Sequence, residues 1–165
     1  MGRSGVALAA GSEGEPSLAA LAPLWASYYA HARGDLPAAV AQGRRALDAL
    51  SHLPWATWER VQAASAVARA LRIQGEYTAC AELCRTHLVD AERRGDLYAQ
   101  VLFGDYPALP QIARGDLGQA RTRADWSEAR WLPGRTTVQS IYWTIHRCYA
   151  DLYEGDVAGA ARRLV

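Results

Sequence analysis

Three side chains that can bind a transition metal are spaced along one stretch of predicted helix. Cys80, Cys84 and His87 stand at positions i, i+4 and i+7, which places them on one helix face. Thiolate and imidazole groups are preferred zinc ligands, and His146 or Cys148 could supply a fourth. The same thiols could act instead as a nucleophile beside a histidine, although the sequence marks neither an oxyanion hole nor an orienting acid.

A wider pattern gives these cysteines a structural role. A glycine followed by Asp or Glu recurs at intervals of 41, 40 and 40 residues, at Gly34, Gly75, Gly115 and Gly155. Cys80 and Cys84 stand five and nine positions after one of these glycines, where the other copies carry Ala or Gly. We therefore expect small core residues here, with neither a metal nor a catalytic residue.

Each recurring glycine separates two apolar, Ala-rich runs, which is typical of the left-handed residue just past a helix end. The acidic residue that follows is suited to cap the next helix, because its carboxylate accepts hydrogen bonds from the first backbone N–H groups. A further Gly-Asp pair, Gly95 and Asp96, lies halfway between the second and third copies. The expected turn residues are Gly34, Asp35, Gly75, Gly95, Asp96, Gly115, Asp116, Gly155 and Asp156.

The period of about 40 residues predicts an all-α fold. Such a unit cannot bury its apolar face alone, so copies must stack on one another. We expect a right-handed α-solenoid of antiparallel helix pairs: 17–33 with 35–50, 55–74 with 76–93, 96–114 with 116–130, and 136–154 with 156 onward. Residues 1–16 are expected to form a flexible leader before a helical-repeat domain, 17–165, of about four pairs with the last one truncated.

One predicted helix contains residues that oppose helix formation. Gly104, Pro107 and Pro110 fall within 96–114, and an internal proline removes a backbone donor and clashes with the preceding turn. We expect this helix to kink or break near residues 104–110.

Composition excludes several classes of partner. The chain of 165 residues has 18 basic and 17 acidic side chains, a net charge of +1, and these are interspersed, so we expect neither nucleic acid nor anionic membrane as a partner. Residues 16–32 carry no charge, but Pro23, His31 and serines interrupt them, and we interpret this stretch as a buried helix. Three cysteines without an export signal favour a cytoplasmic location.

Several segments resemble a known family. The recurring small residues, large apolar residues and Gly-Asp pairs resemble the pattern of tetratricopeptide repeats. The segments "ERRGDLYAQ" at 92–100, "ARGDLGQAR" at 113–121 and "DLYEGDVAGAARR" at 151–163 are similar to the C-terminal helical region of large bacterial serine/threonine protein kinases. The resemblance implies a regulatory region that follows a kinase domain. No Gly-rich phosphate loop, His-Arg-Asp motif, Asp-Phe-Gly motif or lysine occurs in the sequence, so we expect no kinase activity in this chain.

Aromatic residues supply the candidate binding surface. The chain has six Trp and eight Tyr but one Phe, and the first two types combine apolar area with a polar tip. In tetratricopeptide-like arrays the first helix of each pair lines the concave side. The residues placed there are Trp58, Tyr98, Gln139, Tyr142 and Trp143, which would either form a groove for a partner or pack between repeats.

The sequence therefore predicts a non-catalytic module, without a cofactor, that binds a protein or peptide and belongs to a bacterial signalling kinase. A first alternative is the ligand- or partner-sensing helical region of a large bacterial transcription activator. A second is a metal-binding or thiol enzyme that uses Cys80, Cys84 and His87. Exposed repeat ends could also pair two copies of the chain.

Overall fold

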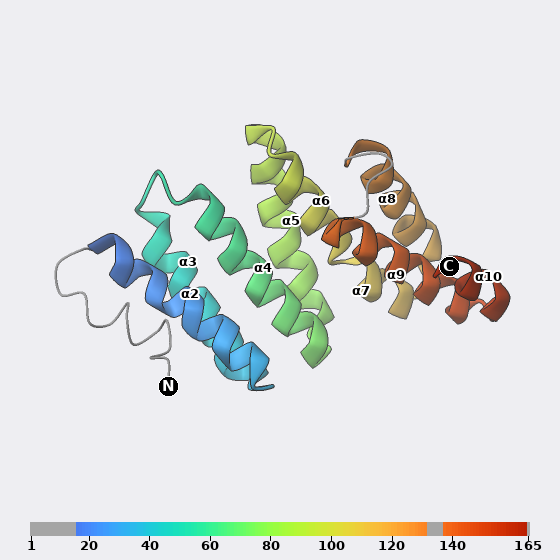
Figure 1. Ribbon diagram of the computed structural model, residues 1–165, viewed down its shortest axis with the longest axis horizontal. Coiled ribbons are helices and arrows are strands. Elements are labelled where there is room, and N and C mark those ends of the chain that lie inside the picture. Colours follow the sequence, from blue (N-terminus) through green and yellow to red (C-terminus); the bar gives the residue numbers. More distant parts are fainter. Residues whose placement is uncertain (1–15, 132–136, 165) are drawn as a thin grey trace. The chain divides into compact units, whose positions relative to one another are not determined.

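The computed structural model describes residues 16–131 and 137–164, and the predicted leader lies outside them except for Pro16. All the regular structure in these residues is helical, with no strand, so the chain is all-α (Figure 1). The helices are α2 (Pro16–Ala32), α3 (Leu36–Ser51), α4 (Thr57–Gln74), α5 (Tyr77–Arg94), α6 (Leu97–Asp105), α7 (Ala108–Ala113), α8 (Leu117–Arg130), α9 (Val138–Tyr153) and α10 (Val157–Arg162).

The helix expected at 96–114 is broken, as its sequence predicts. Helix α6 ends at Asp105 and α7 begins at Ala108, with Pro107 in the N-cap position of α7. Pro110 then lies in the first turn of α7, where a backbone N–H would have no partner within the helix. Both prolines are therefore accommodated by starting a new helix.

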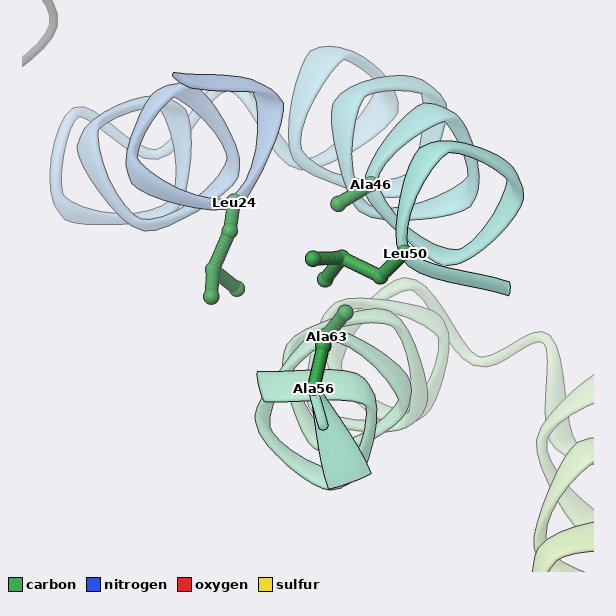
Figure 2. Close-up of a cluster of buried hydrophobic side chains, with 5 residues drawn as sticks. All are labelled: Leu24, Ala46, Leu50, Ala56 and Ala63. Carbon is green, nitrogen blue, oxygen red and sulfur yellow. The ribbon is translucent and has the colours of Figure 1, made fainter. Parts of the chain in front are cut away.

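The chain forms two compact units, residues 1–76 and 77–165. In the first unit α3 packs against both α2 and α4. One cluster of buried side chains joins the three helices: Leu24 from α2, Ala46 and Leu50 from α3, and Ala56 and Ala63 at the start of α4 (Figure 2). The leucines fill the space between backbones that the alanines allow to approach.

Gly43 shows how closely these helices pack. A Cβ atom at this position would lie 2.5 Å from Val67 Cγ2 on α4 and 3.2 Å from Ser27 Oγ on α2. The buried Ser27 hydroxyl donates a 2.7 Å hydrogen bond to the carbonyl oxygen of Ala39, which ties α2 to α3. A larger residue than glycine would therefore force these helices apart.

The second unit is built around α6. This helix packs against α5, α8 and α9, and most of its residues are buried, which suits an apolar helix enclosed by others. Val101 of α6 packs with Ala124 of α8 and Trp143 of α9 in one core cluster. A second cluster joins Ala108, Ile112, Ala120 and Ala150 from α7, α8 and α9.

Five helix ends share one turn geometry. Gly34, Gly75, Gly95, Gly115 and Gly155 all have φ between 66° and 83°. At each, the glycine N–H donates to the carbonyl three residues back, and the next N–H donates at 2.9 Å to the carbonyl five residues back. This pair of bonds is the Schellman motif. The carboxylates of Asp35, Asp96, Asp116 and Asp156 then accept from the backbone N–H three residues on.

Candidate functional site

An aromatic groove lies between α2 and α4 within the first unit. It has a volume of about 450 Å³ and is lined by Leu21, Leu24, Trp25, Tyr28, Trp58, Glu59 and Gln62. The four residues of α2 follow the spacing 21, 24, 25 and 28, which is one face of a helix. Trp58 and Gln62 are one turn apart on α4 and line the other side.

The groove combines exposed rings with a buried base. Trp25 and Trp58 are 53% and 55% exposed, whereas Leu24 is 5% exposed. The indole rings therefore present apolar area to solvent above a packed aliphatic floor. Such rings bind a partner at little cost in conformational entropy, because each has only two side-chain torsions.

Tyr28 is held in place by both helices. Its hydroxyl donates a 3.1 Å hydrogen bond to Gln62 Oε1 on α4. The guanidinium carbon of Arg69 lies 5.6 Å from the centre of its ring, and the ring of Trp25 lies 6.2 Å away. The tyrosine is thus a preorganised part of the groove wall.

Glu59 is the charged side chain among the described residues that line the groove. A carboxylate beside two exposed indoles favours a cationic group on the partner, since a cation is attracted both to the carboxylate and to the face of a tryptophan ring. The groove therefore suits a segment with apolar and basic side chains.

The five residues predicted to bind a partner have different surroundings. Trp58 lies in the groove of the first unit. In the second unit, Gln139 and Tyr142 line a cavity of about 10 Å³, which is the size of one water molecule. The Tyr98 ring lies 5.9 Å from that of Trp131. Trp143 is 4% exposed and belongs to the core cluster with Val101 and Ala124.

Sequence reasoning missed the contribution of α2. We expected residues 16–32 to form a buried helix, but Trp25 and Tyr29 are more than half exposed. The apolar stripe that ends at Tyr28 was present in the sequence. It does not by itself indicate a site, because aromatic residues without neighbouring charges are typical of a core.

The cysteines and histidines of the alternative metal or thiol site are packed against other groups. Cys80 and Cys84 are fully buried, and the ring of His87 stacks on Phe103 with centroids 5.1 Å apart. His146 lines the small cavity beside Tyr142, and the Cys148 thiol donates to the Ala160 carbonyl at 3.5 Å. In residues 16–131 and 137–164, no three His, Cys, Asp or Glu side chains are grouped so that they could hold a metal ion.

Two further findings bear on identity. Within the described part of the chain, no helix has both the length and the apolar character needed to cross a membrane. Comparison with protein-family models, curated proteins and solved structures found no match to this chain.

Proposed function

We propose that the chain is a non-catalytic interaction module that binds a peptide or protein segment in the aromatic groove between α2 and α4. The observation that carries this proposal is the pair of exposed indoles, Trp25 and Trp58, above the buried Leu24. A surface with two solvent-exposed tryptophans beside a preorganised tyrosine is typical of binding sites, since the residues that contribute most to binding are enriched in Trp and Tyr.

The proposed fold is a right-handed tetratricopeptide-like solenoid with repeats of about 40 residues. Two hydrogen bonds support the repeat. Ser27 donates to the carbonyl of Ala39 in the first unit, and Cys148 donates to that of Ala160 in the second. Both donors stand seven residues before a turn glycine and both acceptors five after it. Equivalent positions thus make equivalent contacts, and the five shared turns add to this support.

The proposed partner is a segment that combines apolar and basic side chains. Leu21, Leu24 and the two indoles would contact its apolar groups. Glu59 would accept hydrogen bonds from its lysine or arginine. We propose that this module is part of a cytoplasmic bacterial signalling kinase. The alternatives are the sensing region of a transcription activator and an enzyme that uses the cysteines, and the reading frame on either side in the source DNA separates the first two.

A peptide selection with matched variants tests the proposal. Peptides selected for binding to the full chain should share apolar and basic positions. Trp58→Ala should weaken their binding at least tenfold, about 1.4 kcal/mol. Trp55→Ala is the control, because Trp55 is also 55% exposed but does not line the groove. Equal losses in both variants, or none in Trp58→Ala, would rule out this groove as the binding site.

A further inference from the structure

A second recess lies wholly within the unit of residues 77–165. It has a volume of about 570 Å³ and is lined by residues of α5, α6, α7 and α8, together with Pro107 before α7. Its apolar lining includes Leu88, Phe103, Pro107 and Trp126. This volume lies in the range of pockets that hold small organic molecules, roughly 300–1,000 Å³.

Small residues and the break between α6 and α7 leave this space open. Ala81 of α5 and Gly118 of α8 both line the recess. A Cβ atom built at Gly118 would meet no other atom within 4 Å. At Gly104, in contrast, the space that a Cβ would need is occupied by the guanidinium group of Arg123.

Arg123 of α8 is a cation that lines this recess and is fixed by its contacts. Its guanidinium carbon lies 3.9 Å from the centre of the Trp126 ring, and its Nη2 donates to the carbonyl oxygen of Gln100. The Nε–H is buried and has no acceptor among the described residues. Burial lowers the pKa of Arg123, and the nearby carboxylates of Asp105 and Glu92 oppose that shift. The side chain nevertheless stays charged at neutral pH.

The charges that line the recess have one sign. Arg85 of α5 and Arg123 of α8 are its charged groups among the described residues, and neither Asp nor Glu lines it there. Gln111, Gln119 and Thr122 add neutral polar groups, and Gln111 Nε2 lies 3.5 Å from Gln119 Oε1. An apolar recess with two guanidinium groups is complementary to an apolar anion.

We propose that this recess binds a small organic acid with one carboxylate on an apolar body. The apolar body would lie against Phe103, Leu88 and Trp126. The carboxylate would accept hydrogen bonds from the guanidinium groups of Arg85 and Arg123, whose planar fork matches its two oxygens. This site is separate from the aromatic groove and does not depend on the function proposed for that groove.

Calorimetric titration of the full chain with decanoate, decanol and decylammonium tests the assignment. Each probe is kept below the concentration at which it forms micelles. Decanoate should bind at least tenfold more tightly than decanol, and decylammonium should bind more weakly than either. Equal affinities for the acid and the alcohol would overturn the proposal. It would also be overturned if the chain bound an acidic peptide but did not bind decanoate.

Two variants and their controls locate the binding. Arg85→Gln should weaken decanoate binding about tenfold and leave decanol unchanged, whereas Arg93→Gln, exposed on the same helix and outside the recess, should change neither. Gly118→Leu should place a side chain in the open space and abolish binding, and α8 should remain helical because leucine favours a helix over glycine. Ala129→Leu, exposed on the same helix, is its control. Unchanged affinity in Gly118→Leu would show that decanoate binds elsewhere.

Discussion

The Ser127 hydroxyl donates a 2.8 Å hydrogen bond to the carboxyl group of Asp105, and both side chains are buried. This bond joins the last residue of α6 to α8 in the second unit. Burial raises the pKa of Asp105 to about 7, although the Ser127 hydrogen bond and the charges of Arg123 and Arg147 act in the opposite direction. The carboxyl group is therefore partly protonated at neutral pH.

This raised pKa predicts a loss of stability as the pH rises. The pKa of Asp in an unfolded chain is ~3.9. Between about pH 4 and pH 7 the unfolded chain has therefore released a proton that the folded chain retains. The contribution of Asp105 to the free energy of unfolding therefore falls by up to about 4 kcal/mol over that range and is constant at higher pH. Urea unfolding of the wild type and Asp105→Asn at pH 5 and pH 8 measures it.

Asp105→Asn is informative because the amide keeps the shape of the side chain, and its oxygen can still accept from Ser127. Its stability should decrease less from pH 5 to pH 8 than that of the wild type. All other titrating groups are common to the two proteins, so the difference reports Asp105. Parallel pH profiles would show that this carboxyl group is ionised throughout the range.

Two tryptophans that the sequence treats alike should differ when replaced. Trp143→Ala removes a ring that is 4% exposed and packed against Val101 and Ala124. The cavity should lower the free energy of unfolding by roughly 3–5 kcal/mol. Trp58→Ala removes an exposed ring and should change the free energy of unfolding by less than ~1 kcal/mol. Chemical unfolding followed by circular dichroism gives both values, and a small loss in Trp143→Ala would contradict its place in the core.

Two glycines three residues apart should respond to alanine with opposite signs. Gly115 has a φ of 79°, a left-handed conformation that is strained for alanine. Gly115→Ala should therefore lower the free energy of unfolding by about 1–2 kcal/mol. Gly118 lies inside α8 with open space where a Cβ would be, so Gly118→Ala should stabilise the chain by roughly 0.5–1 kcal/mol. Thermal unfolding of the two variants side by side checks this. No loss of stability in Gly115→Ala would mean that the turn does not require a left-handed residue, and a loss in Gly118→Ala would mean that this position has no room for a side chain.

The turns and most helix bounds could be predicted because their causes are local. A left-handed glycine followed by a capping aspartate is visible in two residues, and the break before α7 follows from Pro107 and Pro110. The bounds of α5 and α8 agree with the prediction to within one residue. Local chemistry therefore determines where these helices begin and end.

The candidate site could be predicted only in part, because exposure depends on packing between helices. Trp58 and Trp143 are the same residue type, and each lies within a helix, yet one lines a groove and the other is enclosed by α6 and α8. The exposure of Trp25 could not be predicted, because the uncharged residues around it are typical of a core. Which side of such a helix is covered is decided by neighbours distant in sequence.

Binding of a peptide in the groove between α2 and α4 can be followed through the indole N–H resonances of the six tryptophans. Assigned by single Trp→Phe variants, they are followed in NMR spectra while a selected peptide is added. We predict that the signals of Trp25 and Trp58 shift in a saturable manner, while that of Trp55, which is equally exposed but outside the groove, does not. Saturable binding that leaves the signals of Trp25 and Trp58 unshifted would show that the peptide does not bind in this groove.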